Sequence, residues 1–176
     1  MALHDDLLAL ARRLVPPVPP PPAPVPPPPP IVEADLRRGV STAYYALFHL
    51  LIHEAMARIV ADPTLRSRVG RSLDHGKMKQ VCQEYSGATV VAGVLTVRPG
   101  VAIAPQLRDI GTAFVDLQQA RHDADYDTAT PLGHPDADLK VMMAENAFLD
   151  WAACQADPSS GVFLTDLFLK SVLRRS

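Results

Sequence analysis

Apolar residues recur at helical spacing along most of the chain. The clearest stripe lies within residues 33–61, where one face carries Leu36, Val40, Tyr44, Leu47 and Leu51, widened by Ala43, Phe48 and Ala55. Steps of three and four residues place such side chains on the same side of an α-helix. We therefore predict a long amphipathic helix here, which Asp62-Pro63 ends because proline cannot continue the backbone hydrogen-bonding pattern.

Five further segments have similar helical spacing, and the sequence contains no convincing pair of strands. We predict helices over residues 2–15, 74–85, 105–127, 135–156 and 161–173, with residues 86–104 mostly loop. Three of them have predicted core faces: Leu3, Leu7, Leu10 and Leu14; Leu107, Ile110, Phe114, Leu117, Arg121 and Ala124; and Leu139, Met142, Met143, Phe148 and Trp151. Asp74 is the expected N-cap of its helix. The fold class is thus an all-α, up-and-down bundle of five to six helices.

Proline divides the chain, because it occupies 12 of the 15 positions from Pro16 to Pro30. Such a tract favours polyproline II, which extends by about 3.1 Å per residue. We expect residues 1–15 to be an N-terminal helix of the bundle, 16–32 a polyproline linker and 33–176 the rest of the bundle. The tract is interpreted as a semi-rigid spacer, with a docking site for a proline-binding domain as the alternative.

Charge is balanced overall but uneven locally. The chain has 17 Lys or Arg and 19 Asp or Glu, a net charge of −2, which excludes a protein that is basic throughout. Residues 58–79 hold six bases and two acids, whereas residues 109–157 hold ten acids and two bases. The basic stretch is either a solvated face or an attraction for a polyanion.

The sequence lacks the patterns of a disulfide framework, a membrane span and a calcium-binding loop. Cys82 and Cys154 are far apart in sequence and fit reduced, packed thiols. No apolar run reaches the roughly 18 residues of a membrane span. Alternating Asp123, Asp125 and Asp127 lack the glycine and glutamate of a calcium loop. We expect a cytoplasmic protein without membrane association, metal site or cofactor.

Arg121 is the most informative single residue. Its spacing places a guanidinium on an otherwise apolar helical row, where a charge is costly unless it is paired. Two interpretations follow: an ion pair with Asp125 one turn later, or an Arg at the floor of a cleft that binds phosphate. A polar ladder of Ser41, Tyr45, His49 and His53 flanks the stripe of the long helix, either as its solvated edge or as a lining of the same cleft.

Three segments of the chain form a recognisable set. They are residues 36–49, LRRGVSTAYYALFH, then Asp74-His75-Gly76, and then residues 114–127, FVDLQQARHDADYD. In this order they resemble the HEPN (higher eukaryotes and prokaryotes nucleotide-binding) superfamily: the first is similar to the Ser-x-Ala-Tyr-Tyr-Ala-x-Phe-His helix of bacterial members, and the third to the family's Arg-x-x-Ala-Asp-Tyr signature. The resemblance covers residues 36–151; the proline tract is not part of the family pattern.

The resemblance implies a helical bundle that pairs as a homodimer, acting in RNA processing, antiviral defence or toxin–antitoxin systems, in some cases beside a nucleotidyltransferase. Catalytic members are metal-independent endoribonucleases with an Arg, four to six residues and then a His. Counting from Arg121, this chain has Tyr126, Asp127 and Thr128 instead, so a base must come from elsewhere.

We therefore assign candidate roles to eight residues. The catalytic candidates are Arg121, Tyr126, His49 and His75, and the substrate-binding candidates are Ser41, Tyr45, Asp125 and His122. The expected function is binding of RNA or nucleotide, with metal-independent RNA cleavage as its active form. The alternative is a catalytically inactive interaction module that serves a partner such as an antitoxin or a nucleotidyltransferase.

Overall fold

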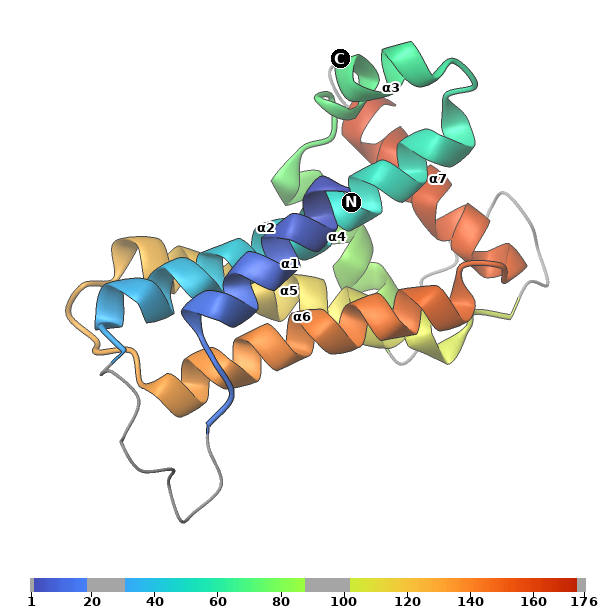
Figure 1. Ribbon diagram of the computed structural model, residues 1–176. Coiled ribbons are helices and arrows are strands. Elements are labelled where there is room, and N and C mark those ends of the chain that lie inside the picture. The colour runs from blue at the N-terminus through green and yellow to red at the C-terminus, as the bar shows by residue number, and fades with distance from the viewer. Residues whose placement is uncertain (1, 19–30, 88–101, 174–176) are drawn as a thin grey trace.

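A computed structural model of the protein describes residues 2–18, 31–87 and 102–173. Within these ranges the chain forms seven helices and no strand: α1 (Leu3–Leu14), α2 (Glu33–Ile59), α3 (Pro63–Gly70), α4 (His75–Ser86), α5 (Pro105–Tyr126), α6 (His134–Cys154) and α7 (Pro158–Leu173) (Figure 1). The predicted all-α bundle is confirmed. Residues 19–30 of the proline tract and most of the predicted loop at 86–104 lie outside the described residues.

Three long helices, α2, α5 and α6, contact one another and form the centre of the bundle. Helix α1 lies along α2 and reaches α6, while α4 packs on α5 (Figure 1). Helix α7 contacts α4 and α2 at the end of the bundle where α3 also meets α2. This arrangement brings the start of α4 close to the middle of α2 and the C-terminal half of α5, where the candidate residues lie.

The stripe predicted for the long helix is confirmed as the centre of the core. Tyr44, Leu47 and Leu51 are fully buried, and the other predicted members are buried as well. From α5, Ile110 and Phe114 pack into the same cluster. Burial of this apolar surface is the main favourable contribution to folding.

The structure adds a short helix, α3, that we did not predict. Asp62 caps it, because its Oδ1 accepts from the backbone N–H of Thr64 at 2.9 Å, and Pro63 occupies the first turn. An acidic N-cap followed by proline is a favourable helix start. Asp62-Pro63 therefore begins α3, while α2 ends three residues earlier, at Ile59.

Helix α1 buries a face that is shifted from the predicted one, of which Leu7, Leu10 and Leu14 are partly buried. Leu3 is 58% exposed, whereas His4, Ala11 and Val15 are buried. The cause is the close approach of α2, where a Cβ on Gly39 would collide with the side chain of Val15. Small side chains at this contact let the two helices pack more tightly than a row of leucines would.

Helix α6 also turns a shifted face to the core, with the predicted Met143 and Phe148 partly buried against it. Leu139 and Met142, both predicted to be buried, are 56% and 46% exposed, although Trp151 is buried as expected. The buried row is instead built mainly of small residues: Ala137, Val141, Ala144 and Ala147. Small residues permit a short distance between α6 and its neighbours α2 and α5. The larger side chains are left on the outside.

An ion cluster fixes α1 to α6. Arg12 Nη1 lies 2.5 Å from Asp138 Oδ1, and Arg12 Nη2 lies 2.6 Å from Glu145 Oε2. The Asp138 side chain is only 11% exposed. Burial opposes its ionisation, but hydrogen bonds from Arg12 and from the backbone of Val18 lower the pKa of Asp138 overall. Asp138 therefore stays charged and holds the N-terminal helix in place.

Cys82 and Cys154 are both free and buried. Burial raises the pKa of the Cys82 thiol, which keeps it protonated and unreactive. None of the helices in the described part of the chain is both long enough and apolar enough to span a bilayer.

Candidate functional site

Arg121 lies at the edge of the core instead of within it. Its neighbours on the same row of α5, Leu117 and Ala124, are 0% and 8% exposed, whereas the Arg121 side chain is 26% exposed. The guanidinium therefore reaches solvent from an apolar row. Both interpretations of the sequence, a paired charge and an anion ligand, are compatible with this position.

Three side chains surround the guanidinium. Its Nε lies 2.8 Å from Asp125 Oδ2 without the alignment of a hydrogen bond, so this contact is a charge pair. Its Nη2 donates to the hydroxyl of Tyr45 at 3.1 Å. Its Cζ lies 5.6 Å and 5.8 Å from the ring centroids of Tyr45 and Tyr126, within the range of cation–π attraction.

His75 lies on the other side of Tyr45, in the first turn of α4. The two rings meet edge to face at 6.1 Å, and His75 stacks on Phe48 at 3.9 Å and 9°. The predicted N-cap, Asp74, is confirmed, because its Oδ1 accepts from the backbone N–H of Lys77 at 3.0 Å. The imidazole is thus held in place by its helix start and by the ring beneath it.

The protonation state of His75 follows from its surroundings. Burial, followed by the positive charge of Arg121, lowers the pKa of His75, so the imidazole is neutral at neutral pH. Its Nδ1 lies 2.7 Å from the hydroxyl of Tyr44. Burial raises the pKa of Tyr44, which therefore stays a neutral hydroxyl. Tyr44 positions the ring and leaves the Nε2 of His75 for another partner.

His49 lies at the border of this cluster. Its ring is 6.5 Å from that of Tyr45, one turn earlier on α2. Burial, followed by the charge of His4, lowers its pKa. His49 also lines a hollow of about 420 Å³ together with His4, His53 and Arg66. It therefore connects the Arg121 cluster with the surface between α1, α2 and α3.

The remaining candidates are placed less centrally. Ser41 is 2% exposed, buried one turn before Tyr45. Tyr126 is 65% exposed although its ring borders Arg121. His122 is exposed, 5.1 Å from the Tyr126 ring and 3.6 Å from Asp123. The structure thus brings together Arg121, Asp125, Tyr45, Tyr126 and His75, with His49 at the border, Ser41 beneath and His122 outside. Their roles stay predictions.

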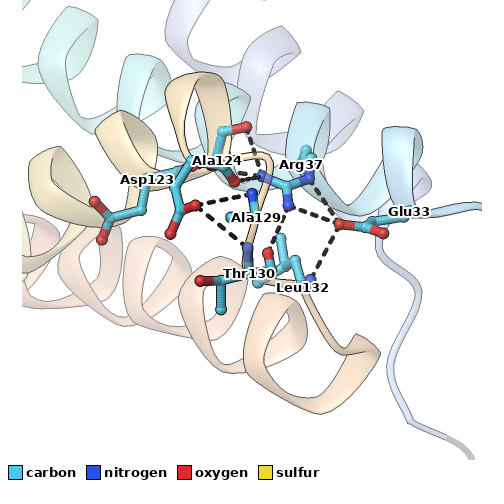
Figure 2. Close-up of polar contacts among 8 residues, drawn as sticks. Glu33, Arg37, Asp123, Ala124, Ala129, Thr130 and Leu132 are labelled. Atoms are coloured by element: carbon cyan, nitrogen blue, oxygen red, sulfur yellow. Dashed lines mark hydrogen bonds and ion pairs between the residues drawn. The ribbon is translucent and has the colours of Figure 1, made fainter.

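Arg37, which sequence reasoning missed, fixes the end of α5 (Figure 2). Its Nη1 donates to the carbonyl oxygens of Ala124 at 3.1 Å and Asp127 at 2.7 Å, and its Nη2 to that of Thr130 at 2.7 Å. Its Nε donates to Glu33 Oε1 at 2.9 Å. These carbonyls end α5 and the turn after it, and would otherwise lack partners. Arg37 therefore holds the segment that carries Asp125 and Tyr126 against α2.

Two features of the sequence point towards the roles of Arg37 and Tyr44, which sequence analysis did not assign. Glu33 and Arg37 are one turn apart, the spacing of a helical ion pair. Tyr44 lies on a core row, where its hydroxyl needs a partner. Neither feature identifies the partner, because His75 and Thr130 lie far along the chain.

The basic stretch at 58–79 covers α3 and the first turn of α4, so it adjoins His75. The guanidinium of Arg66 takes part in a hydrogen bond within the fold, because its Nε donates to the carbonyl oxygen of Val60 at 3.0 Å. Arg68 and Arg71 are exposed. The basic stretch therefore includes Lys77 and Lys79, which share α4 with His75.

The cluster thus combines a partly exposed cation, two aromatic rings and a neutral imidazole. No family model, curated protein or solved structure significantly matches this chain.

Proposed function

We propose that the chain is a HEPN-like helical bundle that binds RNA or a nucleotide through a phosphate at Arg121. One observation carries the proposal: a partly exposed guanidinium lies between Tyr45 and Tyr126, with the neutral imidazole of His75 beyond Tyr45. Arg binds phosphate through its planar fork of N–H donors. The Nη1 of Arg121 makes no hydrogen bond with the described residues and is available to an oxygen.

Asp125 competes with a phosphate for Arg121 but does not prevent its binding. Both side chains of the pair are about a quarter exposed, at 26% and 27%. Ion pairs in such surroundings contribute about 0–1 kcal/mol, because water screens them. A phosphate group, as a diester of RNA or as the terminal phosphate of a nucleotide, can therefore displace the carboxylate. The exposed ring of Tyr126 adds a stacking surface for a base, and such stacking is worth about 1–3 kcal/mol per base in single-stranded complexes.

Metal-independent RNA cleavage is the active form of this proposal. In the tautomer whose Nδ1–H donates to the hydroxyl oxygen of Tyr44 at 2.7 Å, a neutral His75 accepts the proton of a ribose 2′-OH through Nε2. The 2′-oxygen then attacks phosphorus. The bond from phosphorus to the 5′-oxygen breaks, and that oxygen takes a proton from an acid or from water. Arg121 stabilises the charge on the phosphorane. The products are a 2′,3′-cyclic phosphate and a 5′-hydroxyl, and no cofactor takes part.

Anisotropy of a labelled single-stranded RNA in EDTA tests the binding proposal. We expect Arg121→Ala to weaken binding by at least about tenfold, which is 1.4 kcal/mol. Arg38→Ala, an exposed change on α2, removes the same charge and serves as the control. Unchanged affinity in folded Arg121→Ala would refute the site. A denaturing gel of RNA incubated with the protein, with and without EDTA, tests cleavage, which His75→Gln should abolish. Cleavage that occurs without EDTA but is lost in its presence would refute the mechanism.

A second function, a catalytically inactive interaction module, is favoured by the contact of 2.8 Å between Arg121 and Asp125. In this case the pair stabilises the bundle or an interface with a second copy, an antitoxin or a nucleotidyltransferase. It predicts that Arg121→Ala lowers the melting temperature or the oligomeric state and leaves RNA affinity unchanged. Calorimetry and sedimentation of the variant, beside the RNA titration, separate the two functions.

A further inference from the structure

The outer face of α6 is apolar. Leu139, Met142 and Leu149 are 56%, 46% and 69% exposed, and their spacing places them on one side of the helix. They are the large side chains that the alanine-rich buried row leaves outside. Asn146, also exposed, lies between Met142 and Leu149 on this side. Single exposed apolar residues are common, but three on one side of one helix favour an interaction surface.

Leu139 and Met142 line a groove between α5 and α6, which we call the α5–α6 groove; Leu149 lies on the same side of α6. One part is a hollow of about 350 Å³ lined by residues that include Asp109, Thr112, Met142 and Asp150. A second hollow, of about 220 Å³, lies nearer the C-terminal end of α5 and is lined by Asp123, Asp127 and Asp136 among others. The groove therefore combines an apolar wall with carboxylates.

The carboxylates on α5 are regularly spaced. Asp109, Asp116 and Asp123 are exposed and seven residues apart, so they lie on one side of the helix over about 21 Å. The bases that line the two hollows are Lys140 and Arg37, and Arg37 is bound to backbone carbonyls. The negative charge of the groove is therefore largely uncompensated.

The carboxylates also repel one another within the groove. Asp150 on α6 lines the same hollow as Asp109. Burial, followed by the charge of Asp109, raises the pKa of Asp150 above its ordinary value. A positive group placed between these two side chains would relieve that repulsion.

We propose that the α5–α6 groove binds a basic amphipathic helix of a partner protein. The apolar face of that helix contacts Leu139, Met142 and Leu149, and its Lys or Arg side chains pair with Asp109, Asp116 and Asp123. Lys or Arg at heptad spacing matches the seven-residue interval of these carboxylates. Helix-in-groove recognition uses this combination of apolar anchors and flanking charge.

The negative charge of the groove argues against two other occupants, a second copy of this chain and RNA. A twofold pairing of this face with a second copy would set aspartates against aspartates, which is unfavourable. RNA phosphates would meet the same negative surface. The groove is also separate from the candidate site, because Arg121 points from α5 towards Tyr45 of α2. A partner helix and an RNA can therefore bind at the same time.

Two synthetic helical peptides test the proposal by fluorescence anisotropy. Both carry leucines at the a and d heptad positions; one has lysines at e and g, and the other has glutamates there. We expect the lysine peptide to bind at least about tenfold more tightly, with an affinity that falls at high salt. Met142→Ser/Leu149→Ser should weaken binding by about tenfold or more. Leu65→Ser, which changes a leucine on α3 that is 46% exposed, should leave it unchanged.

A second variant tests the charges separately. Asp109→Asn/Asp150→Asn keeps side-chain size, so it tests the groove even if the apolar variant fails to fold. It should weaken binding of the lysine peptide and reduce the salt dependence of that binding. Equal binding of both peptides, or unchanged affinity in this variant, overturns the proposal. Sedimentation showing a dimer that Leu149→Ser dissociates would also overturn it, because the occupant would then be a second copy.

Discussion

Replacing Arg37 with alanine removes the group that holds the end of α5. The side chain is 17% exposed and donates at 2.7–3.1 Å to three carbonyl oxygens that follow or end the helix. A hydrogen bond to a charged group contributes about 1.5–3 kcal/mol, but water replaces part of each lost bond at a partly exposed site. We therefore expect Arg37→Ala to reduce the free energy of unfolding by about 3 kcal/mol in total.

Thermal unfolding measures this loss directly. For a chain of this length, 1 kcal/mol corresponds to about 2–4 °C in melting temperature. Arg37→Ala should therefore melt about 6–12 °C below the wild type. Arg37→Lys should lie between the two, because one ammonium group cannot reach all the carbonyls that a guanidinium bridges.

Arg38 provides the matched control, since it is the next residue on α2 and is exposed. Arg38→Ala loses the same charge and gains the same helix propensity, and should change stability by no more than about 0.5 kcal/mol. If Arg37→Ala and Arg38→Ala melt at the same temperature, the carbonyl contacts do not stabilise the fold and our reasoning about the end of α5 is wrong.

Three other predictions concern packing, pH and the N-terminal helix. Gly111→Ala places a Cβ 2.7 Å from a carbonyl oxygen of α4, so it should lower the free energy of unfolding, measured by urea titration, by about 1–3 kcal/mol despite the higher helix propensity of alanine. Burial lowers the pKa of His4 and His75, so these side chains take up protons at a higher pH in the unfolded chain than in the folded one. The free energy of unfolding should therefore fall as pH drops below about 6.5. A urea midpoint that is equal at neutral and acidic pH would contradict this. Arg12→Ala leaves two carboxylates of α6 without their partner and should cost about 3 kcal/mol by calorimetry, whereas exposed Arg13→Ala should be nearly neutral.

Sequence reasoning succeeded where bulky side chains form the core. The stripe on α2 was predictable because residues such as Tyr44 and Leu47 have one low-energy location, the interior. It failed on α6 because two faces compete. There, close approach to neighbouring helices selects Ala144 and Ala147 for the interior and leaves Leu139 outside, a choice that depends on distances between helices and not on hydrophobicity alone.

The same division applies to the candidate site. The contact between Arg121 and Asp125 follows from their spacing on one helix, and was expected. The contact between Tyr44 and His75 joins residues 31 positions apart, on helices whose packing sets the distance. Arg37 contacts main-chain oxygens, which carry no sequence signal at all. Local pairs were therefore predictable, and pairs made by tertiary packing were not.

The docking of α1 has a consequence for assembly. Helix α1 ends at Leu14 and α2 begins at Glu33, and the segment between them contains the proline tract. The seat of α1, formed by Gly39 and the acidic pair of α6, is identical on every molecule. We therefore expect protein concentration, relative to the effective local concentration of α1 near its own bundle, to decide whether α1 packs on its own molecule or on a neighbouring one.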